Sequence, residues 1–174
     1  NFLSEMIRNI EVKLLECSHC KHIYWYEIPN KELISQMYIE HAKINGISEE
    51  ELFKCKMGPI KYSYTRHENN CANEGDLGVL LSGILACIVG WPIVANILLE
   101  GQKISDENKY KSWLSMYSED KVLQEHTEKI LGIFNSYASN GNAEYREKLK
   151  NNFFLGVKYE TMCWDAYYNM EKWI

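Results

Sequence analysis

A chain of 174 residues is long enough for one domain with a substantial core and short for two. Its composition, 46% hydrophobic and 25% charged, is typical of globular proteins and excludes a disordered one. The net charge of −5, without any cluster of Lys or Arg, argues against nucleic acid as the main partner. We expect one domain, residues 1–174, with an acidic and soluble surface.

The N-terminal part of the chain predicts helices interrupted by one irregular segment. Apolar residues at helical spacing predict a helix over residues 2–16, and residues 17–30 are interpreted as a loop or an insertion. A further helix within residues 28–46 ends at Asn45-Gly46, a typical helix stop. Ser48 is then the expected N-cap of the next helix, and Glu51 completes a capping box.

Helices fill the remainder of the chain. One begins at about Gly58 and gives way to the polar run His67–Asp76. The later ones are expected over the apolar run 78–101, over 110–120, over 120–139 and over about 143–172. This order of helix after helix, with only three prolines, predicts an all-α helical bundle.

The six cysteines do not predict a disulfide framework, because the chain is no small secreted domain and begins with no signal-peptide pattern. We therefore expect a reducing, cytoplasmic location. Cys17, His19, Cys20 and His22 have the spacing of half a zinc site. No second pair of ligands follows to complete a tetrahedron, so we expect no structural zinc.

The apolar run Leu77–Leu99 has two interpretations. It carries no charged residue and is long enough to span a bilayer. Its Pro92, Asn96 and glycines, and the lack of a basic cluster on either flank, favour instead the central helix of a bundle. Cys87 in the middle of the run is either an inert core residue or, with a proton-accepting partner nearby, a nucleophile.

The last helix presents a carboxylate among aromatic residues. Glu160 shares a helix face with Trp164 and Tyr167, and such surroundings raise a carboxyl pKa toward the value that a general acid or base needs. The alternative is a surface glutamate paired with Lys158 or Lys150. Further aromatic residues on predicted inward faces indicate a polar cavity or plain core packing: Tyr64, Trp91 and Tyr117.

Four motifs together resemble the TenA/thiaminase II family from about residue 30 onward. They are "PIKYSYT" at Pro59–Thr65, Cys87 followed four residues later by an aromatic, "YKSWLSMYSED" at Tyr110–Asp120 and "VKYETMCWDAYYNMEKW" at Val157–Trp173. Their order and approximate spacing match those of the family. The resemblance implies a haem-oxygenase-like helical fold that binds no haem and assembles as a homotetramer.

The resemblance also implies an activity. Family members hydrolyse aminopyrimidines released from degraded thiamin, and thiamin itself less well, to give hydroxymethylpyrimidine for salvage, without a metal or cofactor. The nucleophilic cysteine of the family falls on Cys87, its catalytic glutamate on Glu160, and its pocket tyrosines on Tyr64 and Tyr117. Trp91 stands where relatives have another tyrosine, and it is expected to stack on the substrate ring.

One family feature is missing from this sequence. Relatives carry a Gln-Asp pair near the N-terminus whose aspartate holds the amino group of the substrate, and no Gln-Asp dipeptide occurs here. Either the chain is truncated or divergent at its N-terminus, or a neighbouring subunit or another acid, such as Glu11 or Glu16, supplies the carboxylate. The alternative is a noncatalytic relative that binds pyrimidines or forms oligomers and has lost turnover.

Overall fold

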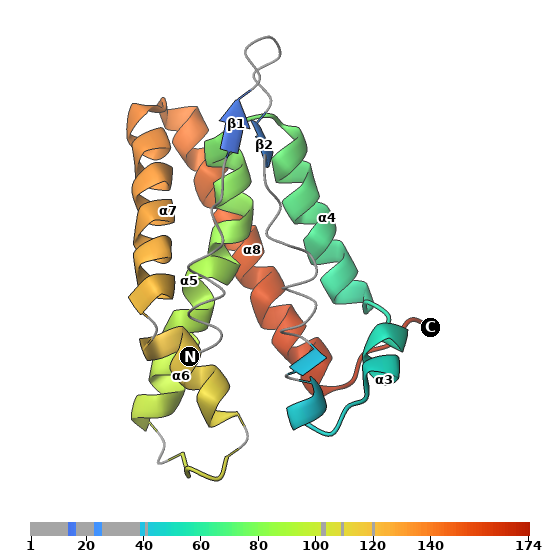
Figure 1. Ribbon diagram of the computed structural model, residues 1–174. Helices are drawn as coiled ribbons and strands as arrows, with labels where there is room; N and C mark the ends of the chain where they lie inside the picture. The colour runs from blue at the N-terminus through green and yellow to red at the C-terminus, as the bar shows by residue number, and fades with distance from the viewer. Residues whose placement is uncertain are drawn as a thin grey trace. The chain divides into compact units, whose positions relative to one another are not determined.

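The computed structural model describes residues 14–16, 23–25, 39–40, 42–101, 104–108, 110–119 and 121–174. Its elements are β1 (Leu14–Glu16), β2 (Ile23–Trp25), α3 (Glu49–Lys54), α4 (Pro59–Asn73), α5 (Leu77–Gly101), α6 (Lys111–Glu119), α7 (Lys121–Asn140) and α8 (Ala143–Tyr168) (Figure 1). Contacts divide the chain into unit 1, residues 1–56 with 95–124, and unit 2, residues 57–94 with 125–174. Apart from one short ribbon the described elements are helices, which confirms the all-α prediction.

The ribbon in unit 1 corrects the prediction for the N-terminal part. β1 and β2 pair antiparallel, with Leu14 opposite Trp25 and Leu15 opposite Tyr24. The predicted helix over residues 2–16 is therefore wrong at its last three residues, and the predicted loop over 17–30 is wrong at β2. Antiparallel pairing joins residues that are not neighbours in the sequence, which helical periodicity alone does not reveal. The other residues of both predictions lie outside the described ones.

The turn before α3 follows the sequence prediction. Asn45 and Gly46 form a turn in which Gly46 has φ of 76°, a left-handed conformation that glycine adopts without a Cβ penalty. Ser48 then caps α3: its hydroxyl accepts a hydrogen bond from the Glu51 N–H at 3.2 Å, and its own N–H donates to the Glu51 carboxylate at 2.9 Å. The expected capping box is confirmed.

Helix α4 in unit 2 is longer than predicted. It begins after Gly58, as expected, but continues to Asn73 through the polar run that was predicted to end it. The polar residues stay helical because this stretch packs on α8. The His67 ring donates a hydrogen bond to the Asn152 carbonyl at 3.1 Å, and Cys71 is 1% exposed.

The residues that follow α8 fold back onto the first turn of α4. α8 ends at Tyr168, four residues before the predicted end, and Met170 has φ of 52°. The chain then runs back, so that the Glu171 carboxylate accepts a hydrogen bond from the Ile60 N–H at 3.2 Å. Gly58, the N-cap of α4, has no side chain to do this, and Glu171 supplies the missing acceptor.

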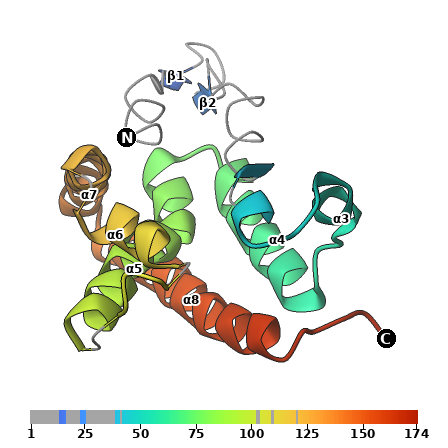
Figure 2. The same cartoon turned by 60° about the horizontal axis from the view of Figure 1, so that its bottom comes forward.

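α8 packs along α4, and both views of the chain show the two helices side by side (Figures 1 and 2). They run antiparallel, since Glu74 pairs with Lys148 near one end and Ile60 with Glu171 near the other. α5 follows α8 in the same direction. A core cluster joins the four helices of unit 2, and its members are Cys71, Val79 and Leu149 with Phe134, Ala138 and Tyr145 against them.

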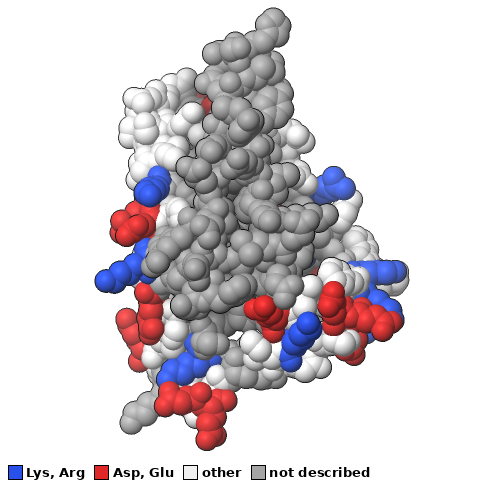
Figure 3. All heavy atoms as spheres, in the orientation of Figure 1, with Lys and Arg blue, Asp and Glu red and all other residues white. Residues whose placement is uncertain are grey.

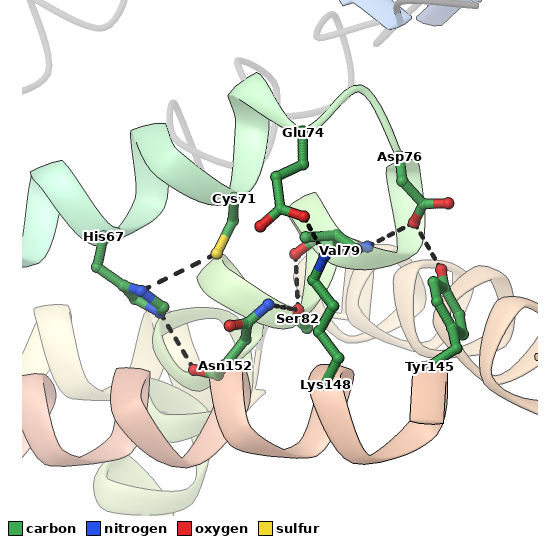
Figure 4. A network of polar contacts seen from close by, with 9 residues as sticks. All are labelled: His67, Cys71, Glu74, Asp76, Val79, Ser82, Tyr145, Lys148 and Asn152. Carbon is green, nitrogen blue, oxygen red and sulfur yellow. Dashed lines mark hydrogen bonds and ion pairs between the residues drawn. The ribbon is translucent and has the colours of Figure 1, made fainter. Parts of the chain in front are cut away.

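A polar network connects α4, α5 and α8 (Figure 4). The side-chain amide of Asn152 on α8 donates to the Ser82 hydroxyl at 3.1 Å, and Ser82 donates to the Val79 carbonyl at 2.6 Å. Asp76 accepts from Val79 N–H at 2.8 Å and from the Tyr145 hydroxyl at 2.5 Å. Because Ser82 is fully buried, these bonds stabilise one relative placement of α5 and α8.

By length and composition alone, α5 is apolar enough to cross a membrane. In unit 2, however, one face of this helix is buried against protein, at Val79, Leu81, Ser82, Leu85 and Ala86. These contacts favour the central helix of a bundle over a membrane span.

The charges on the face shown in Figure 3 alternate in sign. Among the described residues drawn there, Lys and Arg side chains stand beside Asp and Glu rather than gathering into a basic patch.

Gly83 is required where α5 meets α4. A Cβ there would lie 2.8 Å from the Cys71 Sγ and 2.9 Å from its Cβ, and buried Cys71 has little room to move. We expect Gly83→Ala to destabilise the fold by about 1–2 kcal/mol, the overpacking cost less the gain in helix propensity. Gly132→Ala on α7 is the matched control, because nothing lies within 4 Å of its Cβ position. Urea unfolding measures both, and a stabilised Gly83→Ala would contradict this packing.

Candidate active site

The candidate site lies where α4, α5 and α8 meet, around Gly156. A Cβ on Gly156 of α8 would be 3.1 Å from the Ala86 Cβ, 3.3 Å from the Gly83 carbonyl oxygen and 3.8 Å from the Tyr64 hydroxyl. One helical turn after Gly83 is Cys87, and one turn after Gly156 is Glu160. Because α5 and α8 run in the same direction, small residues on both helices place the cysteine and the glutamate at the same level, beside Tyr64.

Cys87 is half-buried and holds its proton strongly. Burial is the main cause that raises the pKa of its thiol to about 11, and the negative charge of Glu160 raises it further. A hydrogen bond from Trp91 and the positive charge of Lys61 act in the opposite direction. The resting sulfur is therefore a neutral thiol, with a carboxylate that can accept its proton and an indole N–H that favours its thiolate.

Tyr64 brings a buried hydroxyl into the same place. Its side chain is 0% exposed, and among the described residues its oxygen makes no hydrogen bond of normal geometry. Burial raises the pKa of this hydroxyl well above its usual value, and the charge of Glu160 and its side-chain interaction with the hydroxyl raise it further. The ring stacks on Tyr159 with centroids 5.4 Å apart, and the Lys61 ammonium lies over it at 4.9 Å.

A cleft of about 430 Å³ opens beside this group. Glu160 and Trp91 line it, and the rings of Trp91 and Trp164 are 4.7 Å apart. Cys87 is not part of the lining, but it interacts with both Glu160 and Trp91. The other lining residues are mainly apolar: Ala86, Val89, Gly90, Ile93, Val94, Phe153, Val157, Thr161 and Asp165. A flat, mostly apolar ring with polar edges suits such a cleft.

The structure joins four of the five predicted site residues. Cys87, Glu160, Tyr64 and Trp91 lie together in unit 2. Tyr117 belongs to α6 in unit 1, where it is half-buried, and its place in the pocket stays a prediction.

The surface alternative for Glu160 is weakened. Lys150 pairs with Glu147 instead, at 3.5 Å, while Glu160 acts on Cys87 and Tyr64. The zinc candidates Cys17–His22 lie outside the described residues. Within the described part of the chain, no group of three or more His, Cys, Asp or Glu is arranged to hold a metal ion.

Sequence reasoning missed Lys61 and Glu68, the charged residues that α4 adds to the site. Lys61 lies over Tyr64, and Glu68 is half-buried one turn after it. The spacing of three and four residues from Tyr64 places both on its helix face, but the predicted helix ended before Glu68. Cys163 on α8 was also missed: it is buried, and the charge of Glu160 is one cause that raises its pKa, after burial.

The chain is similar to known proteins in sequence and, for one crystal structure, in fold. The aminopyrimidine aminohydrolase of Bacillus subtilis is 32% identical over 79% of this chain and 57% of its own length. The aminopyrimidine aminohydrolase of Halalkalibacterium halodurans is 26% identical over 76% of this chain and 59% of its own. The crystal structure of a TenA-like thiaminase from Sulfolobus solfataricus matches with a TM-score of 0.64 and 26% identity, covering 83% of this chain and 63% of that one.

The chain thus spans less than two thirds of the length of these relatives. Its helices have the all-α, haem-oxygenase-like fold. The sequence model of the TENA/THI-4/PQQC family matches residues 10–170, nearly the whole chain. The chain therefore belongs to the TENA/THI-4/PQQC family.

Proposed function

We propose that this protein is an aminopyrimidine aminohydrolase of the thiaminase II type. It would convert 4-amino-5-aminomethyl-2-methylpyrimidine, and thiamin less well, into hydroxymethylpyrimidine for thiamin salvage. The observation that carries this proposal is the meeting of Cys87 and Glu160 beside the buried Tyr64 hydroxyl. The names of the two aminohydrolases among its relatives support it.

The first step is addition of Cys87 to the ring. Glu160 accepts the thiol proton and passes it to a ring nitrogen, which makes the neighbouring ring carbon electrophilic. The sulfur forms a bond to that carbon, and its electron pair displaces the ring π electrons toward the protonated nitrogen. A pKa of about 11 for Cys87 means that this proton transfer must accompany attack.

The second step exchanges the leaving group. The aminomethyl group leaves in its protonated form: electrons return from the ring nitrogen through the ring and break the C–N bond to the exocyclic methylene, which releases ammonia. The water that then adds to the methylene gives up the matching proton. The ring nitrogen loses its proton through Glu160, and the C–S bond breaks to restore Cys87. The sum is amine plus water giving alcohol plus ammonia, with no oxidant and no cofactor.

The proposal also includes the expectations about substrate contacts, domain organisation, oligomeric state and location that the sequence analysis stated. Trp91 and Tyr117 would contact the substrate ring, Trp91 by stacking. The chain would act as one domain, as a homo-oligomer, in the cytoplasm. No metal takes part in the chemistry proposed.

The test is ammonia release from 4-amino-5-aminomethyl-2-methylpyrimidine, with product identified by mass spectrometry. We expect stoichiometric ammonia and hydroxymethylpyrimidine over many turnovers. The competing candidate is a noncatalytic relative that binds the pyrimidine without turnover. If calorimetry shows that hydroxymethylpyrimidine binds while no ammonia is released, that candidate is favoured and the proposed hydrolase function is contradicted.

A further inference from the structure

The site holds a second carboxylate, on a different helix from Glu160. Glu68 is half-buried on α4, and its Cα lies 3.9 Å from the point where a Cβ on Gly83 would stand. Gly83 faces Gly156, whose own Cβ point is 3.8 Å from the Tyr64 hydroxyl. Glu68 therefore lies at the same three-helix contact that forms the site.

Helix direction brings the two carboxylates toward each other. Side chains on an α-helix lean toward its N-terminus. On α4 this direction carries Glu68 toward the level of Tyr64. On antiparallel α8 it carries Glu160 toward the level of Gly156, so the two side chains approach from opposite ends of the site.

The local charges do not balance. Burial raises the pKa of the Glu68 carboxyl most; Lys61 lowers it, and the charge of Glu160 raises it again. Among the described residues that act on one another here, the carboxylates of Glu68 and Glu160 face the one ammonium of Lys61, which leaves one negative charge without a counter-charge. The neighbouring cleft adds Asp165 and, within the described residues, no Lys or Arg lines it.

A second observation indicates that a ligand belongs here. The Tyr64 hydroxyl is fully buried without a well-formed hydrogen bond to any described residue, and the charges of Glu160, Cys87 and Glu68 all act on it. A buried hydroxyl normally has a partner. A primary ammonium fits this place, because it carries one positive charge and three N–H donors.

We propose that Glu68 is a specificity-determining residue that binds the protonated aminomethyl group of the substrate, the group that leaves as ammonia. This inference rests on the proposed hydrolase function. The ring amino group of an aminopyrimidine is uncharged and would leave the extra negative charge uncompensated. The hydroxymethyl product is also neutral, so the same carboxylate favours substrate over product.

Because the ammonium leaves as neutral ammonia, its attraction to Glu68 stabilises the bound substrate and not the transition state. Glu68→Gln should therefore raise KM for the aminomethyl substrate about 10- to 100-fold, the loss of one charge-assisted hydrogen bond, and raise kcat by a similar factor, so that kcat/KM changes little. Glu68→Asp keeps the charge and should retain part of the affinity.

The deciding experiment compares two ligands in a Cys87→Ser background, where the substrate is not consumed. Calorimetry should show the aminomethylpyrimidine binding at least about tenfold more tightly than the hydroxymethylpyrimidine. Adding Glu68→Gln should abolish this preference. Adding Glu147→Gln, the same change at an exposed ion pair on α8, should preserve it. Circular dichroism verifies that each variant is folded.

The outcomes separate this inference from the function on which it rests. If the wild-type chain releases ammonia but the preference survives Glu68→Gln, the role of Glu68 is wrong and the hydrolase stands. If the preference is absent before Glu68 is changed, its role is also wrong. If the wild-type chain binds neither pyrimidine and releases no ammonia, both proposals fail together.

Discussion

Cys87→Ser should lower the rate of ammonia release by about 1,000-fold or more while leaving pyrimidine binding nearly intact. A serine hydroxyl is far less acidic than a thiol, so Glu160 cannot prepare it for addition to the ring. Serine has nearly the size of cysteine, and the half-buried position should tolerate it. Steady-state ammonia assays measure the rate, and calorimetry with hydroxymethylpyrimidine measures binding.

Cys55→Ser is the matched control for this change, because Cys55 is an exposed free cysteine in unit 1. It should retain full activity. Full activity in Cys87→Ser would exclude covalent attack by this sulfur. A Cys87→Ser chain that loses binding as well as turnover would show instead that the residue shapes the pocket.

Glu160→Gln should lower the rate of turnover and raise the rate at which Cys87 is alkylated. Turnover should fall by about 100- to 10,000-fold, because the amide cannot transfer the proton. Alkylation of Cys87 should become faster at pH 8–9, since the negative charge of Glu160 is one cause that holds the pKa of the thiol near 11. Removing that charge lowers this pKa, and each unit of decrease raises the thiolate fraction about tenfold in this range.

Iodoacetamide labelling followed by peptide mass spectrometry isolates Cys87 from the other cysteines. Trp91→Phe provides a control of opposite sign, because losing the N–H donor raises the pKa and should slow labelling. Slower or unchanged labelling in Glu160→Gln would contradict the electrostatic coupling of the two residues. Normal turnover in that variant would remove Glu160 from the mechanism.

The sequence predicted the parts of the fold that local chemistry determines. The capping box at Ser48 and the stop at Asn45-Gly46 depend on residues within one turn of each other. The length of α4, in contrast, depends on contacts with residues that are distant in the sequence. Its polar C-terminal half is helical because α8 offers His67 a carbonyl and buries Cys71, and neither partner is near in sequence. The ribbon β1–β2 was missed for the same reason, since its pairing is not local.

For the site, motif resemblance and periodicity selected Cys87, Glu160, Tyr64 and Trp91, which meet in unit 2. Spacing along single helices cannot show which faces of different helices meet, so Glu68, in a polar run that was predicted to end the helix, was not recognised as a site residue. The charges that act on Tyr64 come from three helices, α4, α5 and α8, so the pattern of any one helix does not show their balance.

The raised pKa of Cys87 has a protective consequence while the cleft is empty. With a pKa of about 11, only about one sulfur in 10,000 is ionised at pH 7. Peroxides and electrophilic metabolites react with the thiolate and hardly with the thiol, so the resting residue resists irreversible oxidation. The sulfur becomes reactive only when a ring nitrogen arrives to receive its proton through Glu160. Cys87 is therefore open to oxidation or alkylation mainly while a substrate is bound.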